Sequence, residues 1–245
     1  MKIRSDFILP ELKYKRILLK VSGEALAGDA HRGLDFTIVG ELCESIKTCV
    51  DMGVQIGLVI GAGNFWRGVK DGAGKVERVS ADRMGMLATC MNCLAVCDVF
   101  RQLGAKARVM TAVDIQGVGE RYDTRKAIEY MEDGNIVLFA GGSGAPFFST
   151  DTAAVLRAAE IHADGILLAK NIDGVYDSDP RTNPDAKKFD RISYDEVLAR
   201  HLAVMDTTAT SLAMDNSIPV IVFALAQPEN IRRSLSGEAL GTTVG

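Results

Sequence analysis

Short apolar runs alternate along the chain with longer segments in which apolar residues recur every three or four positions. The short runs are rich in Ile, Val, Leu and Phe, which predicts buried strands, and the longer segments predict helices with one apolar face. The predicted strands are 16–21, 54–60, 107–110, 136–140, 165–169 and 218–223. The predicted helices are 36–52, 79–103 in more than one segment, 124–131, 152–163, 193–201, 206–215 and a last helix that ends at 235.

Strands that alternate with helices predict an α/β fold with a mainly parallel sheet covered on both faces. Ligands of such sheets bind at the loops that follow the carboxyl ends of the strands. Glycine-containing segments follow three of the predicted strands, at 22–26, 61–68 and 141–151. Because the carboxyl ends of parallel strands meet at one edge, we expect these three segments to lie together.

The segment 141–151 is the most informative of the three. Its glycines allow the backbone to approach a ligand closely. Ser149, Thr150 and Asp151 are candidate N-caps of the helix that follows, and the free N–H groups of a helix start favour an anion. The adjacent Phe147 and Phe148 place two apolar rings at a loop tip. The segment predicts a pocket for a phosphate and a ring, and the plainer alternative is a tight turn between a strand and a helix.

Composition narrows the class of protein. The 245-residue chain has a net charge of −4 and a pI near 5.5, which argues against nucleic-acid binding because a phosphate backbone requires a basic face. No apolar run approaches the roughly 18 residues of a membrane span, and the N-terminus lacks a signal-peptide core. We therefore expect a cytoplasmic protein with no nucleic-acid or membrane partner. We expect one domain over 15–245, preceded by an N-terminal extension over 1–14.

The five cysteines do not have the pattern of a disulfide framework. Cys90, Cys93 and Cys97 share one helical stripe, but their neighbours supply no fourth metal ligand, and the histidines are scattered along the chain. We expect these cysteines to be small buried residues of the core or of a subunit contact. We expect no metal site formed by protein thiols or imidazoles.

Several common nucleotide and hydrolase motifs are missing. No Walker-type phosphate loop occurs, and no Ser/His/Asp or Cys/His set has a suitable spacing. Gly61-Ala62-Gly63 starts like a dinucleotide fingerprint, but Trp66 stands at the third glycine position, which disfavours a nicotinamide-dependent enzyme.

The remaining residues suit phosphoryl transfer, which needs cations and backbone donors around the moving group more than a nucleophilic side chain. Lys20 at the end of the first predicted strand and Arg67 in a glycine loop are candidate cations. Asp151, Asp179 and Asp206 are candidates to orient these cations or to take part in magnesium binding, although a lone aspartate is more often a cap.

Five linked motifs resemble those of the bacterial uridylate (UMP) kinases of the amino-acid kinase superfamily. They are Lys20-Val21-Ser22-Gly23-Glu24-Ala25-Leu26, Gly61 to Gly68, Asp82-Arg83-Met84-Gly85-Met86-Leu87-Ala88-Thr89, Gly144 to Asp151 and Asp173-Gly174-Val175-Tyr176. The resemblance implies a three-layer α/β/α sandwich around a mainly parallel sheet, assembled as a homohexamer. Sister kinases that act on carbamate, aspartate or N-acetylglutamate share the glycine turns but lack the motif that begins at Asp82 and the phenylalanine loop.

The resemblance also implies roles for individual residues. Lys20, Arg67 and Asp206 would be catalytic, with Lys20 stabilising the transferred group and Asp206 orienting Lys20. The ATP-binding residues would be Lys20, Val21, Ser22, Gly23, Gly63, Arg67, Asn171, Tyr176 and Asp179. The UMP-binding residues would be Ala62, Asp82 (at the ribose), Ser143, Gly144, Ala145, Pro146, Phe147, Phe148, Ser149 and Thr150. An allosteric GTP site would comprise Gly28, Asp29, Ala30, His31, Arg32 and Gly33.

The implied reaction is reversible phosphoryl transfer from ATP to UMP in pyrimidine (CTP) biosynthesis, with Mg²⁺ held mainly by the nucleotide phosphates. GTP would activate the enzyme and UTP would inhibit it. Three alternatives stay open at this point. They are a storage or sensor protein that binds nucleotides without turnover, a sister kinase with a small acid as acceptor, and a dinucleotide oxidoreductase.

Overall fold

A nine-stranded sheet forms the centre of the molecule, in the order β4-β3-β5-β2-β1-β6-β8-β9-β7. The computed structural model describes residues 12–67, 74–225 and 227–245. All strand pairs are parallel except β8 with β9, which confirms the prediction of a mainly parallel sheet. The strands are β1 (Arg16–Val21), β2 (Gln55–Ile60), β3 (Ala107–Thr111), β4 (Glu120–Arg121), β5 (Ile136–Ala140), β6 (Gly165–Lys170), β7 (Arg191–Ile192), β8 (Val220–Ala224) and β9 (Thr242–Val244).

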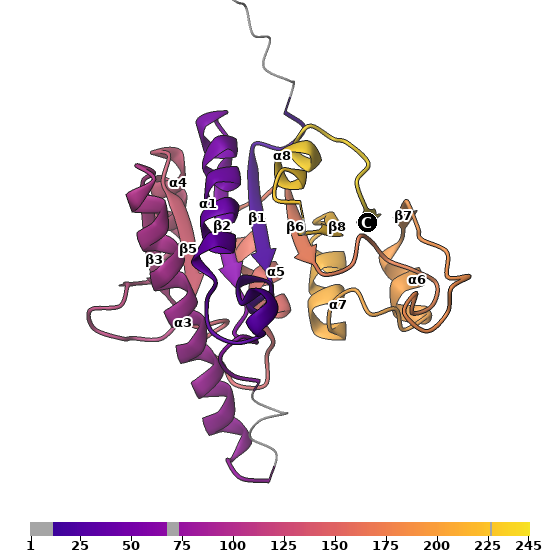
Figure 1. The fold of residues 1–245 in the computed structure, drawn as a ribbon, viewed down its shortest axis with the longest axis horizontal. Helices are drawn as coiled ribbons and strands as arrows, with labels where there is room; N and C mark the ends of the chain where they lie inside the picture. The colour runs from indigo at the N-terminus through magenta and orange to yellow at the C-terminus, as the bar shows by residue number, and fades with distance from the viewer. Residues whose placement is uncertain (1–11, 68–73, 226) are drawn as a thin grey trace, which may run out of the picture.

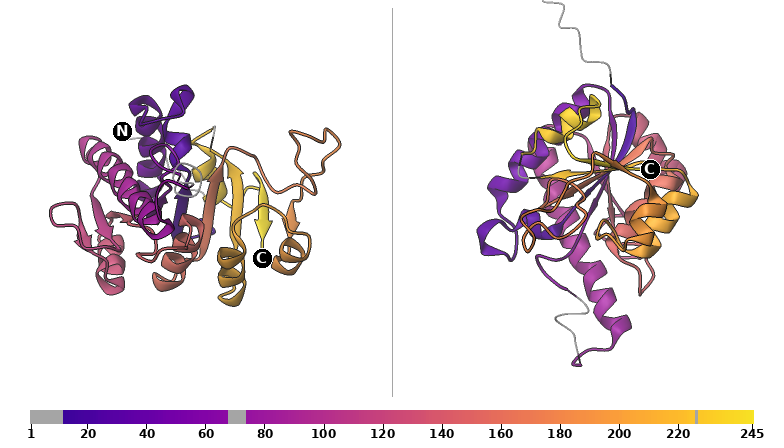
Figure 2. Two further views of the ribbon diagram at one scale, coloured as in Figure 1. Left: turned by 90° about the horizontal axis from the view of Figure 1, so that it is seen from below. Right: turned by 90° about the vertical axis from the view of Figure 1, so that its right-hand side faces the viewer.

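Helices cover both faces of this sheet, so the molecule has three layers (Figures 1 and 2). One layer contains α1, α3 and α8, and the other contains α4, α5, α6 and α7. The helices are α1 (Phe36–Asp51), α3 (Arg78–Gln102), α4 (Thr124–Glu132), α5 (Thr150–Glu160), α6 (Tyr194–Ala199), α7 (Thr207–Asp215) and α8 (Asn230–Leu235), with the 3₁₀ turns η1 (Gly23–Leu26) and η2 (Gly28–Ala30). The α/β/α sandwich is therefore confirmed.

The alternation of side chains along β1 decides which layer each residue meets. Ile17, Leu19 and Val21 belong to the core between the sheet and α1, α3 and α8. Leu18 belongs to the core on the α5 and α7 side. Lys20 has the same parity as Leu18, so its side chain leaves the carboxyl end of β1 toward α5 and α7.

The long helix α3 is continuous over 25 residues, so the prediction of more than one segment is wrong. Gly85 costs a helix roughly 1 kcal/mol relative to alanine, a cost that the packing of α3 on α1, β3 and β5 offsets. By length and composition α3 is able to cross a membrane, but half of its most apolar window is buried inside the molecule. That burial is typical of a core helix.

All five cysteines are free and buried, as expected from their pattern. Cys90, Cys93 and Cys97 of α3 pack in the same core cluster as Cys43 and Cys49 of α1. Burial raises the pKa of Cys43 and of Cys49 to about 12. These thiols are therefore protonated at neutral pH and are poor nucleophiles.

The strands at the edges of the sheet were not predicted from the sequence pattern. The strands β4 and β7 have two residues each and β9 has three, which is too short to give a recognisable alternation. The strand β8 begins at Val220 rather than at Ile218, because Pro219 has no N–H to donate to the ladder. Near the N-terminus, Tyr14 is buried and the Lys13 N–H donates to the Leu235 carbonyl at 3.0 Å.

Candidate functional site

The carboxyl ends of β5, β2, β1 and β6 lie side by side, so the three glycine-containing segments meet at one edge as predicted. Gly23 is required there, because a Cβ atom at this position would collide with the Gly61 carbonyl. Arg67 lies beside the first of these turns, with its Nη2 atom 2.6 Å from Oε1 of Glu24. The edge thus gathers Lys20 and Arg67, the two predicted cations.

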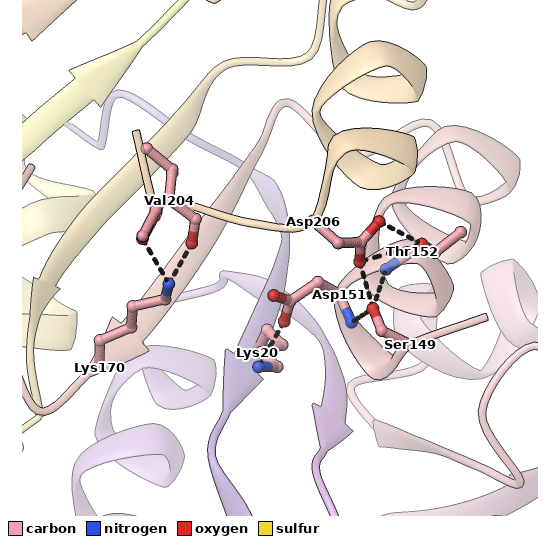
Figure 3. A network of polar contacts seen from close by, with 8 residues as sticks. Lys20, Ser149, Asp151, Thr152, Lys170, Val204 and Asp206 are labelled. Atoms are coloured by element: carbon pink, nitrogen blue, oxygen red, sulfur yellow. Dashed lines mark hydrogen bonds and ion pairs between the residues drawn. The ribbon is translucent and has the colours of Figure 1, made fainter. Parts of the chain in front are cut away.

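Lys20 is the most buried cation of this edge, with 9% of the residue exposed. Its Nζ atom lies 2.5 Å from Oδ1 of Asp151, in the first turn of α5 (Figure 3). A buried ammonium needs an anionic partner to offset the cost of leaving water. Asp151 supplies that partner, and its position at a helix N-terminus suits a carboxylate.

Asp206 lies beside the start of α5, the helix that carries Asp151. The resemblance implies that Asp206 orients Lys20, but the ion pair of Lys20 is with Asp151. The Asp206 carboxylate accepts hydrogen bonds from Ser149 and Thr152 of the α5 start, and from the Ala209 N–H at 2.9 Å as the N-cap of α7. Asp206 therefore joins the N-termini of two helices, and within the described part of the chain its contacts lead to Lys20 through α5 (Figure 3).

Ser149 connects these two carboxylates. Its side-chain oxygen accepts from the N–H groups of Asp151 and Thr152 at 3.0 and 3.2 Å, which makes it, of the three candidates, the N-cap of α5. Its hydroxyl donates to Asp206. Because this cap fixes the first turn of α5, it also fixes the carboxylate that pairs with Lys20.

A cavity of about 970 Å³ opens on the β6 side of Lys20. Five of the predicted ATP-binding residues line it, namely Lys20, Ser22, Asn171, Tyr176 and Asp179. The predicted Val21, Gly23, Gly63 and Arg67 are absent from its lining, and Val21 is fully buried toward the opposite layer. The lining also contains residues that were not predicted from the sequence, including Lys170, Arg200 and Val204.

Local polar contacts hold the irregular wall of this cavity. The Tyr176 hydroxyl donates to Asp173 Oδ1 at 2.8 Å, and Lys188 Nζ lies 3.0 Å from Asp173 Oδ2. The hydrogen bond to Asp173 raises the pKa of the Tyr176 hydroxyl. Asp179 accepts from Arg181, and these hydrogen bonds lower the pKa of the Asp179 carboxyl.

A smaller cavity of about 110 Å³ lies on the β2 and α3 side. Six predicted UMP-binding residues line it, namely Ala62, Asp82, Ser143, Phe148, Ser149 and Thr150. The predicted Gly144, Ala145, Pro146 and Phe147 lie outside the lining. Gly85, Met86 and Thr89 also line this cavity and were not predicted, although their spacing of three, four and seven residues from Asp82 places them on the same side of a helix.

Asp82 fixes the loop that closes the smaller cavity. Its Oδ2 atom accepts from the Phe147 N–H at 2.8 Å and from Arg78 Nε at 2.8 Å. Phe147 has φ of 72°, a left-handed conformation that is unfavourable for a bulky residue. The guanidinium of Arg78 also lies 5.2 Å from the Phe147 ring centre. Asp82 thus stabilises a strained loop in addition to facing the cavity.

The predicted GTP segment, 28–33, is linked to the glycine loop after β2. The Gly33 N–H donates to the Asn64 carbonyl at 3.1 Å, and the Asn64 side chain donates to the Gly33 carbonyl at 2.7 Å. Asn64 and Asn92 of α3 exchange amide hydrogen bonds of 2.9 Å, and Asn92 donates to the Gly61 carbonyl at 2.8 Å. The segment is therefore hydrogen-bonded to the loop that contains Ala62, a residue of the smaller cavity's wall.

These elements define a class of protein. Residues 15–224 match the profile of the Amino acid kinase family, so the chain belongs to that family. The predicted superfamily and fold are confirmed.

Solved structures narrow the resemblance within that class. A UMP kinase from Bacillus anthracis is 37% identical with a TM-score of 0.91, over 95% of this chain and 96% of that chain. A UMP kinase from Ureaplasma parvum is 33% identical with a TM-score of 0.90, over 96% and 100%. A uridylate kinase from Archaeoglobus fulgidus is 25% identical with a TM-score of 0.72, over 94% and 99%. The predicted resemblance to UMP kinases is therefore confirmed.

Proposed function

We propose that this chain transfers the γ-phosphoryl group of ATP to UMP, giving ADP and UDP. The observation that carries the proposal is the position of the ion pair between the buried Lys20 and the partly buried Asp151, which lies between two cavities. Thr150 lines the smaller cavity and the next residue, Asp151, lines the larger one with Lys20. Two ligands bound in these cavities would meet at the start of α5, and Lys20 is the buried cation at that junction. The UMP kinases with similar structures support the choice of UMP as acceptor.

In the proposed step, an oxygen of the UMP phosphate forms a bond to the γ-phosphorus of ATP. The bond between that phosphorus and the β,γ-bridging oxygen breaks, and ADP leaves with the electron pair. The second pKa of a phosphate monoester is about 6, so the attacking group is mostly dianionic at neutral pH and needs no general base. The task of the protein is to offset the repulsion between the two phosphates. Lys20 does so at the junction, and Arg67 adds charge at the same edge.

Mg²⁺ enters this proposal as part of the ATP complex. Over the described ranges 12–67, 74–225 and 227–245, no group of three His, Cys, Asp or Glu side chains is placed to hold a metal ion. Mg²⁺ commonly keeps several waters and binds through substrate phosphates instead of a protein cage. The larger cavity offers both space and acidic side chains such as Asp151 beside the expected phosphates.

The proposal extends to regulation, assembly and location. We propose that GTP activates the enzyme through 28–33, that UTP inhibits it, and that it serves pyrimidine (CTP) biosynthesis in the cytoplasm. We also propose a homohexamer, in which an apolar stripe on α3 forms a subunit contact. Four side chains of that stripe are exposed, namely Met84, Leu87, Met91 and Leu94. Their spacing of three or four residues gives one face of the helix.

The proposal is tested by ADP release from ATP and Mg²⁺ with UMP, CMP, dTMP, carbamate or aspartate as acceptor, with and without GTP. We expect turnover with UMP and faster turnover with GTP. Turnover with carbamate or aspartate instead would indicate a sister kinase. Tight nucleotide binding without turnover of any acceptor would indicate a storage or sensor protein.

A further inference from the structure

Asn92 is a fully buried polar residue in the middle of α3. The residues that follow it on the helix, Cys93, Val96 and Cys97, belong to the hydrophobic core between the sheet and α1. Burying an amide costs free energy unless its polar atoms find hydrogen-bond partners, and a leucine would fill a similar volume without that cost. The proposed phosphoryl transfer gives Asn92 no task, so the reason for a polar side chain here has to come from its hydrogen bonds.

The hydrogen bonds of Asn92 lead to the glycine loop that follows β2. Its Nδ2 group donates to the Gly61 carbonyl at 2.8 Å and to Asn64 Oδ1 at 2.9 Å, and its Oδ1 atom accepts from Asn64 Nδ2 at 2.9 Å. The Asn64 Nδ2 group also donates to the Gly33 carbonyl at 2.7 Å. Each NH₂ group therefore faces a backbone carbonyl as well as the other amide, which fixes the orientation of both side chains.

The hydrogen bond to Gly61 fixes the direction of an N–H group as well as that of a carbonyl. The Gly61 carbonyl and the Ala62 N–H belong to one trans peptide unit, so they point in opposite directions. Because Asn92 holds the carbonyl, the Ala62 N–H is turned away from Asn92. Ala62 lines the smaller cavity, whereas Gly61 and Asn92 are absent from that lining. In the part of the chain that the structure describes, this N–H has no acceptor, so it is available to a ligand.

The surroundings of the loop restrict how this peptide can turn. A Cβ atom on Gly23 would lie 2.3 Å from the Gly61 oxygen and 2.5 Å from Asn64 Oδ1, so the turn after β1 packs directly against both oxygens. The next carbonyl of the loop, that of Ala62, accepts from the Trp66 N–H at 2.9 Å. An anion that enters the smaller cavity would therefore meet an N–H group whose direction is already set.

We propose that Asn92 is a positioning residue for the smaller cavity. With Asn64 as its partner, it holds the peptide between Gly61 and Ala62 so that the Ala62 N–H faces the phosphate of UMP. This inference rests on the proposed function for the identity of the acceptor. Without the Asn92 donor, the Gly61 carbonyl would lose its partner, and a turn of the peptide would point this oxygen at the phosphate. A carbonyl oxygen repels a phosphate, so the acceptor would bind more weakly.

The test compares Asn92→Leu with the wild type by calorimetric titration of UMP and of uridine. We expect UMP binding to weaken about 10- to 100-fold, as for loss of a hydrogen bond to a charged group. Binding of uridine, which has no phosphate, should change by less than about threefold, and so should binding of ADP, which is proposed to occupy the larger cavity. Asn92→Asp keeps the shape of the side chain but removes the Nδ2 donor, so it should show the same selective loss.

The matched control is Asn135→Leu. Asn135 is also buried, and its Nδ2 group donates to the Tyr130 carbonyl at 2.9 Å, in the turn between α4 and β5. Neither residue lines either cavity. This variant also loses a buried amide and its hydrogen bond, so it should lose stability while it keeps the wild-type affinity for UMP and uridine.

Unchanged UMP binding in a folded Asn92→Leu protein would overturn the proposal. Equal weakening of UMP and uridine would also overturn it, because Asn92 would then support the whole wall of the cavity instead of one N–H group. Thermal unfolding shows whether each variant is folded, and Asn92→Asp takes the place of the leucine variant if that variant does not fold. A wild type that binds UMP without phosphorylating it would refute the proposed function, and a selective loss of UMP affinity in Asn92→Leu would still support the positioning role. A wild type that does not bind UMP would overturn both.

Discussion

The two cavities at the carboxyl edge of the sheet are built in different ways. The larger is walled mainly by irregular chain at 171–181 and 200–204, held by contacts such as those of Asp173 with Tyr176 and Lys188. The smaller is walled by α3, by the start of α5 and by the glycine segment between β5 and α5. Exposed ion pairs contribute only about 0–1 kcal/mol each, whereas helices packed on a core are held by extensive apolar burial. We infer that the larger cavity, which we call the donor side because ATP is proposed to bind there, is adjustable. The smaller cavity, which we call the acceptor side because UMP is proposed to bind there, is preformed.

Lys20 lines the larger cavity at its junction with the smaller one, so its loss should have the largest effect. We predict that Lys20→Ala lowers kcat by about 10²–10³-fold or more, because a preorganised charge at the reacting phosphoryl group is removed. Steady-state ADP release measures this change. Lys47→Ala, which breaks an exposed ion pair with Asp51 on α1, is the control and should keep full activity. Near-normal turnover of a folded Lys20→Ala protein would reject the mechanism.

Asp82 belongs only to the acceptor side. We predict that Asp82→Ala raises the KM for UMP about 10- to 100-fold and changes the KM for ATP by less than about threefold. The reason is that the substitution removes a charged hydrogen-bond acceptor and releases the strained loop at Phe147. Initial rates over a grid of both substrates separate the two KM values. Equal increases in both would show that Asp82 acts on the whole site instead of on the acceptor.

Replacing Asp206 tests whether this residue acts directly at Lys20 or indirectly, by holding α5 in place. We predict that Asp206→Ala destabilises the protein by about 1–2 kcal/mol, because α7 loses its N-cap and Ser149 loses an acceptor. Thermal and urea unfolding give the stability, and kcat is measured on the folded protein. The matched control is Asp123→Ala, which removes the N-cap of α4 away from the site. If kcat falls sharply while stability equals that of the wild type, Asp206 contacts the reacting groups directly.

The smallest effect is expected in the adjustable wall of the donor side. Asp173→Asn should weaken the ion pair with Lys188 and raise the KM for ATP by roughly two- to fivefold, as for a partly exposed ion pair. The KM for UMP should stay unchanged. High salt should have a similar effect on the wild type, because it screens such a pair. A tenfold change in the KM for UMP would contradict the division into two sides.

Periodicity predicted the central strands and most helices because those elements are buried and regular. The strand 136–140 was predicted correctly, and Ser149 was among the three candidate caps of α5, since each depends on a few neighbouring residues. The short edge strands were missed because they are defined by distant partners and have almost no pattern of their own.

The positions of site residues were predicted correctly where a loop directly follows a strand. The contacts between side chains from separate elements were predicted less well. The glycine loops placed Lys20, Ala62 and Ser149 at the right edge. Asp151 lies 131 residues after Lys20 in the sequence. Their pairing therefore depends on how α5 packs beside β1, which local sequence does not reveal.

The central claim is that phosphoryl transfer occurs directly at the junction marked by Lys20. The most direct measurement is a single turnover with ATP labelled in its γ-phosphoryl group, UMP and Mg²⁺, comparing the wild type with Lys20→Ala. We predict that the label moves into UDP in the wild type and that this transfer is slowed by orders of magnitude in the variant. Label that accumulates as inorganic phosphate, or that reaches UDP equally fast in both proteins, would contradict the account.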